Sequence, residues 1–399
     1  MALPNVRFVE IFTDNTESYG ERENYVILTQ REKSFIASIY CSPVRQGCLK
    51  SLVSQAIKVK LEMACDICFT LLVTGPGDRI VLGTRPIPTP GPKEVLVKVA
   101  IAGLNPHDQL VRDIGFFIGK NVPAPTGIDI VGTGHAVGKD VNNFKVGDLV
   151  FGNGDPFDGD YMATQEYTLM DIDFLGHVPS SVTQDEAATL PLNALTMCIA
   201  LFDASTHGFP SPLTPAGKSF DYKHTPLVIL GGGSNCGKFA IQLAKWAGFG
   251  TIIAIAGKTK AEYLVELGAT HIIDRTLSDD KIESEVRNIV GDNLLHVCTA
   301  VLPKDQTLGA RLLSNSKKGT LVTVTKGTVD ETKLGEKKAG YRVRGFLCRP
   351  HAKDKRELAT LFWKAFPGLI EKGILRPTPY EVVKGLDENK INEILDEYG

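Results

Sequence analysis

The stretch GGGSNCGK, residues 231–238, has the spacing in this sequence that most directly implies chemistry. Counted from Gly232, it fits G-x-x-x-x-G-K, which is most of a P-loop that cradles nucleotide phosphates. Counted as a dinucleotide-binding turn, it places Gly232, Ser234 and Gly237 at the three positions that require small residues. The first interpretation predicts a nucleotide hydrolase, and the second predicts an enzyme that transfers hydride.

The residue after the lysine favours the dinucleotide turn. A P-loop needs Ser or Thr there to ligate magnesium, and this chain has Phe239. An apolar strand is expected at 226–230 and a helix from about Asn235, so the free N–H groups of the helix would face a pyrophosphate. Lys238 is then a solvated helix residue, and Cys236 is either a thiol of lowered pKa or an inert small residue. The predicted cofactor contacts in this turn are Gly232, Gly233, Ser234, Asn235, Cys236 and Gly237.

The next strand, TIIAIAG, ends where the adenosine ribose of a dinucleotide is recognised. A site specific for NAD presents Asp or Glu there to the 2′-hydroxyl. This chain instead has Gly257, Lys258, Thr259 and Lys260. Because lysines and a hydroxyl can bind a 2′-phosphate through charge-assisted hydrogen bonds, the sequence favours NADPH over NADH. The alternative is that Lys258 and Lys260 only begin a solvated helix.

Two domains are expected to position these residues. Short alternating runs from Phe69 onward, with Val95, Val97 and Val99 on one strand face, predict a β-rich, barrel-like domain. After Ser180 the pattern is helical with a break at Pro191, and from residue 226 strands and helices alternate as in a doubly wound parallel sheet.

The connecting segments complete this organisation. The polar stretch 206–225 is expected to be a surface loop, and the mostly helical tail to return to the first domain. The predicted boundaries are an extension of unknown role at 1–64, a catalytic domain at 65–195, a cofactor domain at 196–340 and the return segment at 341–399.

Composition excludes several classes of protein. The chain has 399 residues, of which 43% are hydrophobic, as suits two domains. A net charge of −2 with dispersed Lys and Arg argues against a nucleic-acid partner. With no apolar run of about 20 residues and no signal-like start, we expect a cytoplasmic protein without a membrane partner. Four of its eight cysteines, Cys41, Cys48, Cys65 and Cys68, are numerous enough for a structural zinc site, but their loose spacing favours reduced thiols.

From about Phe69 to its end the sequence resembles the medium-chain dehydrogenase/reductase superfamily. The resemblance is strongest to the zinc-independent quinone oxidoreductase and enoyl reductase branch, including fungal trans-acting enoyl reductases of polyketide synthesis. It implies an α/β protein with a GroES-like β-rich catalytic domain and a Rossmann NADPH-binding domain. The matching stretches are AGLNPHDQ (102–109), PTGIDIVGTG (125–134), NNFKVGDLVFG (142–152), DEAATLPLNALT (185–196), the glycine turn with IQLAKWAG, and LGATHIIDR (267–275).

The resemblance also shows what this chain lacks. Alcohol dehydrogenases of the family hold catalytic zinc with a Cys in C-H-x-D and a His in G-H-E, where this chain has Asn105 and Ile128. Neither replaces a zinc ligand, so no metal is predicted. Without a Lewis acid, hydride transfer suits an acceptor that delocalises the resulting charge. We therefore expect NADPH-dependent reduction of an enone, enal or enoyl thioester, or of a quinone.

The resemblance places further residues near the reaction. Asn105 would lie beside the nicotinamide ribose or the substrate, although it also suits a helix N-cap before Pro106. Tyr161 is a candidate proton donor or a packed core aromatic. Thr196 would lie near the nicotinamide or bond its own helix backbone. Thr325 and Phe346 match positions that border the nicotinamide.

Two questions stay open at this stage. A protein of the same fold can keep the NADPH pocket and lose turnover, so a non-catalytic NADPH-binding protein is the alternative function. The acceptor pocket would be built from variable loops such as FFIGKNVPAP and the insert at 205–225, which do not identify the acceptor. Both a monomer and a homodimer are compatible with the sequence.

Overall fold

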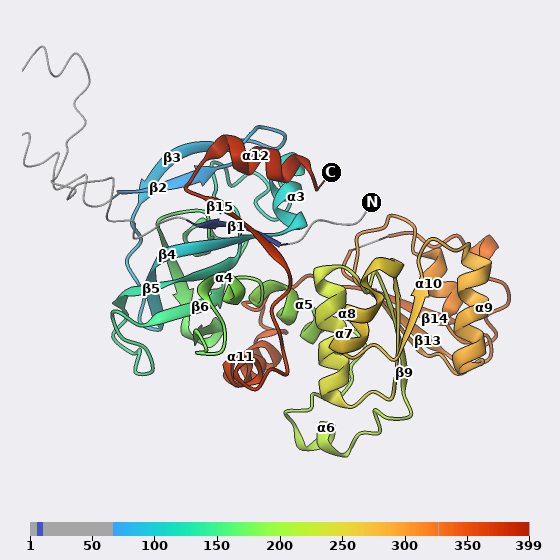
Figure 1. The fold of residues 1–399 in the computed structure, drawn as a ribbon. Helices are drawn as coiled ribbons and strands as arrows, with labels where there is room; N and C mark the ends of the chain where they lie inside the picture. Colours follow the sequence, from blue (N-terminus) through green and yellow to red (C-terminus); the bar gives the residue numbers. More distant parts are fainter. Residues whose placement is uncertain (1–5, 11–66, 326, 399) are drawn as a thin grey trace, which may run out of the picture.

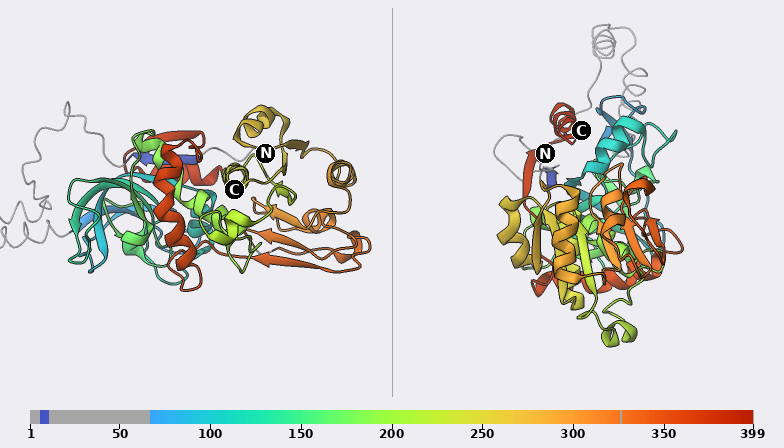
Figure 2. Two further views of the ribbon diagram at one scale, coloured as in Figure 1. Left: turned by 90° about the horizontal axis from the view of Figure 1, so that it is seen from below. Right: turned by 90° about the vertical axis from the view of Figure 1, so that its right-hand side faces the viewer.

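The computed structural model describes residues 6–10, 67–325 and 327–398, which form two lobes (Figure 1). Figure 2 shows the same two lobes from two further directions. Most of the expected extension at 1–64 lies outside the described residues, but strand β1 (Val6–Glu10) belongs to the sheet of the first lobe. These five residues are therefore part of the first domain and not of an appendage. No helix within the described ranges combines the length and apolar character that crossing a membrane requires.

The first lobe is the predicted β-rich domain. Its main sheet has seven strands in the order β15-β1-β4-β5-β6-β8, with β7 paired to β4, and β2 and β3 form a separate hairpin. Val95, Val97 and Val99 are buried together in its core, as their alternation predicted. The strands are β2 (Ile67–Leu72), β3 (Val81–Pro86), β4 (Glu94–Leu104), β5 (Asp129–Val137), β6 (Leu149–Asn153), β7 (Tyr167–Asp171), β8 (Leu175–His177) and β15 (Tyr380–Lys384).

The second lobe is the predicted doubly wound domain. Its six strands run in the order β11-β10-β9-β12-β13-β14, and every pair is parallel. Helices α7 and α8 pack on the face of Leu227 and Ile229, whereas α9 and α10 pack on the face of Val228. The elements are β9 (Pro226–Leu230), β10 (Thr251–Ala256), β11 (His271–Asp274), β12 (His296–Thr299), β13 (Gly319–Thr323), β14 (Tyr341–Gly345), α7 (Asn235–Ala247), α8 (Ala261–Leu267), α9 (Asp279–Val290) and α10 (Thr307–Leu312).

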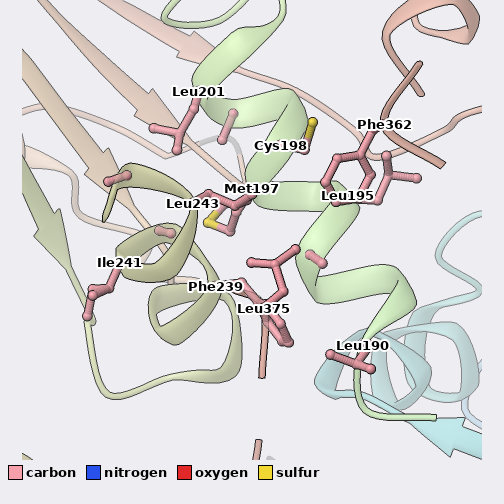
Figure 3. Close-up of a cluster of buried hydrophobic side chains, with 14 of the residues drawn as sticks. Leu190, Leu195, Met197, Cys198, Leu201, Phe239, Ile241, Leu243, Phe362 and Leu375 are labelled. Atoms are coloured by element: carbon pink, nitrogen blue, oxygen red, sulfur yellow. The ribbon is translucent and has the colours of Figure 1, made fainter. Parts of the chain in front are cut away.

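One buried helix packs against both lobes. Pro191 is the first residue of α5 (Pro191–Phe202), after the short helix α4 (Gln184–Ala187), so the expected break is a helix start. Apart from Leu192, every residue of α5 is buried. Figure 3 shows α5 packed between Leu243 of α7 and Phe362 of α11 (Arg356–Glu371). This buried helix fixes the position of one lobe against the other.

The end of the chain lies on the first lobe, but the predicted boundary at 340 is too early, because β14 (Tyr341–Gly345) is still a strand of the second lobe's sheet. Helix α12 (Glu388–Asp396) packs on α3 (Pro106–Ile114), where Arg112 forms an ion pair of 2.7 Å with Asp396 and donates to the carbonyl of Asn392 at 3.1 Å. Strand β15 pairs with β1 at the edge of the sheet.

The expectation of a plain surface loop at 206–225 was wrong. This segment contains helix α6 (Pro215–Ser219), and Phe209 and Tyr222 are buried in the core shared with Phe249. The polar composition of the stretch led to the prediction of a loop. The sequence does not show that Phe209 and Tyr222 pack into a core, because their partners come from other parts of the chain.

Candidate functional site

The glycine turn after β9 is shaped by contacts that side chains would destroy. A Cβ on Gly237 would lie 2.3 Å from the carbonyl oxygen of Gly231, and one on Gly232 would lie 2.8 Å from Cβ of Ala254. Gly231 also has a positive φ of 80°. Gly233 differs, since the nearest atom to its added Cβ would be 3.5 Å away. The protein itself thus requires Gly232 and Gly237, whereas at Gly233 it leaves room for a ligand.

Helix α7 begins at this turn with Ser234 as its N-cap. The Ser234 hydroxyl accepts from the N–H of Gly237 at 3.0 Å and donates to the carbonyl of Ala300 at 2.7 Å. The N–H of Ser234 already donates to the Gly231 carbonyl at 2.9 Å. Asn235 and Cys236 hold the first two helical positions, where N–H groups have no acceptor within the helix. The N–H of Ser234 is therefore already used, whereas the N–H groups of Asn235 and Cys236 have no partner within the helix.

A groove lies beside the turn at the carboxyl ends of the parallel strands. It has a volume of about 490 Å³ including its opening to solvent. Lys260 lines it, and its Nζ donates to the carbonyl of Gly233 at 3.4 Å. The lining residues are Gly231, Gly233, Ser234, Ala256, Gly257, Thr259, Lys260, Arg275 and Val301.

The charges at the ribose end of this groove differ in part from the prediction. Lys258 does not line the groove, and its Nζ lies 3.4 Å from Oδ2 of Asp274, the last residue of β11. Arg275, the next residue, does line the groove and was not predicted. The signal was present, because LGATHIIDR ends a strand and neighbouring parallel strands bring their carboxyl ends to one edge.

Lys238 is not the solvated residue that the sequence suggested. The residue is only 2% exposed, and its Nζ donates to Oδ1 of Asn235 at 3.1 Å. Burial, with Lys260 nearby, lowers the pKa of Lys238 to about 8. Helical periodicity failed here because all residues from Gly237 to Ala244 are buried, so this part of α7 has no solvated face.

A second group of side chains, from Asn105, Asp129, Asn193 and Cys236, meets between the lobes; we call this group and its surroundings the seam. Asn105 is the N-cap residue of α3, with Pro106 at the first helical position, as its sequence suggested. The Asn105 side chain donates to Oδ2 of Asp129 at 2.7 Å and accepts from Nδ2 of Asn193 at 2.9 Å. Asn193 in turn accepts from Sγ of Cys236 at 3.2 Å. One chain of hydrogen bonds thus connects β5, α3, α5 and α7.

Two buried carboxyl groups support this chain. Asp129 is fully buried, and its Oδ1 accepts from the N–H of Leu192 at 2.6 Å. Burial raises the pKa of Asp129 to about 7, against the opposing effect of the Leu192 and Asn105 donors. Asp108 accepts from the N–H groups of Asn105 at 2.7 Å and Gly127 at 2.8 Å, and burial raises its pKa as well.

The seam does not fit a zinc ion. The resemblance matches Asn105 and Ile128 to zinc ligands of the family; in the structure the amide of Asn105 is bonded to Asp129, and Ile128 is a buried apolar side chain. In the described part of the chain, no group of three or more His, Cys, Asp or Glu side chains is arranged to hold a metal. Cys41, Cys48 and Cys65 of the considered structural site lie outside the described residues.

Thr196 joins the seam from α5. Its side chain forms a hydrogen bond with the Cys348 thiol, and burial raises the pKa of that thiol to about 12. Cys236 has the same raised pKa for the same main reason, so burial outweighs the helix N-terminus and the thiol is not activated. Thr325 and Phe346 follow β13 and β14, respectively. The hydroxyl of Thr323 donates to the carbonyl of Thr325 at 2.6 Å, and the carbonyl of Thr323 accepts from the N–H of Phe346 at 3.4 Å.

Tyr161 stands apart from the other candidates. Its hydroxyl donates to Oε1 of Glu94, and burial together with this carboxylate raises the pKa of Tyr161. Glu94 is the first residue of β4, whereas Asn105 follows its last residue, so they lie roughly 30 Å apart along the strand. The structure does not bring the Tyr161 hydroxyl together with Asn105 and Thr196.

A row of contacting aromatic rings begins at α3; we call His107, Phe117 and Phe157 the aromatic wall. His107 contacts Phe117 with ring centroids 6.0 Å apart, and Phe117 contacts Phe157 at 5.2 Å. The guanidinium of Arg349 lies 4.1 Å over the Phe157 ring. Phe117 comes from the predicted acceptor loop FFIGKNVPAP. The wall therefore connects the helix capped by Asn105 with the residue that follows Cys348.

Comparisons with known proteins agree with this architecture. The family model for an alcohol dehydrogenase GroES-like domain matches residues 91–197, and that for a zinc-binding dehydrogenase matches residues 236–360.

Individual relatives cover much of the chain. It is 31% identical to the dehydrogenase orsE of Emericella nidulans, over 58% of this chain and 70% of the relative. It is 32% identical to the trans-enoyl reductase tazE of Aspergillus terreus, over 56% of this chain and 73% of the relative. The quinone oxidoreductase of Pseudomonas syringae pv. Tomato DC3000 shares the fold, with a TM-score of 0.63 and 22% identity over 82% of this chain and 96% of that one.

Proposed function

Because the chain belongs to the medium-chain dehydrogenase/reductase superfamily, we propose that it is an NADPH-dependent reductase of conjugated acceptors that works without a metal ion. The acceptor is an enone, an enal or an enoyl thioester, or a quinone. The observation that carries the proposal is the seam, where Asn105 bonds Asp129 and Ile128 is a buried apolar side chain, at the two positions that the resemblance matches to zinc ligands. Similarity to a trans-enoyl reductase supports the same class of acceptor.

The chemistry follows from what the seam offers. NADPH, when bound, supplies the hydride. Hydride addition to a plain ketone concentrates charge on one oxygen, which a metal ion would stabilise. A conjugated acceptor spreads this charge, so hydrogen bonds from neutral donors such as the Asn105 amide and the Thr196 hydroxyl suffice. With an enone, an enal or an enoyl thioester, the hydride would go to the β-carbon and a proton from solvent to the α-carbon. With a quinone, the hydride and a proton from solvent would give the hydroquinone.

The groove supports NADPH as the cofactor. The space beside Gly233 and the N–H groups of Asn235 and Cys236 suit the pyrophosphate. Lys260 and Arg275 line the end expected to hold the adenosine ribose, where they would bind a 2′-phosphate. No carboxylate is among the lining residues, since Asp274 is paired with Lys258 outside the groove.

Oxidation of reduced cofactor with a panel of acceptors tests the proposal. We expect NADPH to be oxidised faster than NADH with a quinone, an enal or an enoyl thioester. The saturated thioester and the matching saturated ketone are the controls and should give no oxidation. Stoichiometric zinc together with ketone reduction would overturn the proposal. NADPH binding without oxidation by any acceptor would instead support the non-catalytic binding protein.

A further inference from the structure

The hydrogen-bond chain across the seam has a fixed direction. An ionised carboxylate only accepts hydrogen bonds, so Asp129 must face the amide nitrogen of Asn105. The Asn105 oxygen then faces the Asn193 nitrogen, and the Asn193 oxygen faces the Cys236 thiol. The side-chain donors therefore all point the same way, from Cys236 on α7 to Asp129 on β5.

This direction leaves one donor of Asn105 uncommitted. A side-chain amide has two N–H donors, and Asn105 uses one of them on Asp129. The residue is only 2% exposed, so a wrongly turned amide would place its oxygen against a carboxylate in a site with little water. The carboxylate of Asp129 thus determines where the second N–H of Asn105 points.

We infer that Asp129 is a positioning residue, which holds the Asn105 amide so that its second N–H meets the oxygen of the conjugated acceptor. This inference rests on the proposed function. The hydrogen-bond chain would thereby fix a donor where negative charge develops on the acceptor. Asn193 and Cys236 extend the fixed orientation to the first turn of α7, beside the cofactor groove.

Protonation of Asp129 would remove this control. A carboxylic acid can donate as well as accept, so the Asn105 amide could then turn either way. The carboxyl is faced by the Leu192 N–H from α5, by Asp108 from α3 and by the Cys236 and Cys348 thiols. Burial is the main influence on its titration, with a pKa of about 7. We expect activity to fall as the pH decreases through this value.

The variant Asp129→Asn tests the inference by its effect on rate and pH profile. The expected result is a loss in kcat of about tenfold to a hundredfold, because a misplaced donor costs about that much. The acid limb near pH 7 should disappear, and the Kd for NADPH should stay within about twofold. Asp108→Asn, at the other buried carboxyl of the seam, is the matched control and should keep the acid limb. An unchanged pH profile in Asp129→Asn would overturn the inference.

A readout without turnover separates this inference from the proposed function. In protein labelled with [15N]asparagine, the side-chain resonances of Asn105 and Asn193 should shift with a midpoint near pH 7, and Asp129→Asn should abolish the shift. If Asp129→Asn does not fold, Cys236→Ala removes the last bond of the chain and should shift the Asn193 resonances alone. Absence of any titration at Asn105 would overturn the inference even if the wild type reduces enoyl thioesters. Titration without turnover would overturn only the proposed function.

Discussion

The cofactor groove and the interdomain seam are built in opposite ways. The groove comes mainly from two short segments, 231–234 and 256–260, and its central feature is an absent side chain at Gly233. The seam combines side chains from α3, β5, α5 and α7, and each bonds another. A site that recognises phosphate through backbone can therefore be encoded locally, whereas a site that orients a donor exists only in the folded chain.

Substitutions at two glycines test this comparison with the largest expected effect. In Gly237→Ala the new Cβ meets backbone at 2.3 Å, so the helix and strand must separate. We expect a loss of about 2–3 kcal/mol in the free energy of unfolding, despite the better helix propensity of Ala, and loss of NADPH binding. Denaturant unfolding and cofactor fluorescence measure the two effects.

Gly233→Val is the matched control, because its nearest neighbour is the flexible side chain of Lys260. Its stability should change by less than about 0.5 kcal/mol, while the Kd for NADPH should rise at least tenfold. Equal destabilisation by both variants would contradict the claim that Gly233 serves the ligand and Gly237 serves the fold.

Lys238 provides a second test of the comparison. It lies on α7, the helix that begins beside the groove, but it is as buried as the residues of the seam. Its folded pKa of about 8 lies below the ordinary lysine pKa of 10.5, so the unfolded state binds more protons between these pH values. Stability should therefore rise as the pH increases from about 8 to about 10.5, by about 3 kcal/mol at most. Lys238→Met should remove this rise, which thermal unfolding across the pH range would show.

The exposed Lys245 on the same helix provides the control. Lys245→Met should keep the slope of the wild type. If the stability of Lys238→Met rises with pH as steeply as that of the wild type, then burial does not lower the pKa of Lys238. This result would contradict the claim that the start of α7 is buried while the groove beside it is open.

The smallest expected effect concerns the charges of the groove. Lys260→Met and Arg275→Leu should each weaken NADPH binding by about fivefold to tenfold and leave NADH binding nearly unchanged, since each removes a charge-assisted contact. Lys258→Met should change NADPH affinity by less than about twofold, because Lys258 is directed to Asp274. Calorimetric titration with both cofactors measures these affinities, and an equal loss for all three variants would favour a diffuse electrostatic effect.

Part of the groove could be predicted from spacing, because strand β9, the glycine turn and α7 follow one another directly. Of the residues predicted to contact the cofactor, four line the groove: Gly233, Ser234, Gly257 and Lys260. Their role in binding a cofactor stays a prediction. Arg275 was missed although LGATHIIDR indicates a strand end, because the sequence does not show that this strand lies next to β10 and brings Arg275 to the groove. Lys238 was misjudged because helical periodicity does not show what packs on the first turn of a helix.

The seam could be predicted only in part. The resemblance pointed to Asn105 and Thr196, and both lie at the seam. It also pointed to Tyr161, whose hydroxyl bonds Glu94 instead. The bonds that join Asn105 to Asp129 and Asn193 depend on side chains that are 24 and 88 residues distant in sequence. No periodicity or local spacing encodes such contacts.

The fate of the transferred hydride tests the central claim most directly. NADPH deuterated at the transferring position would be incubated with an enoyl thioester and chelator-treated protein, and the product analysed by NMR. The account predicts deuterium on the β-carbon of a saturated thioester, at a rate that chelation does not change. Deuterium on the carbonyl carbon, or a reaction that requires added zinc, would contradict it.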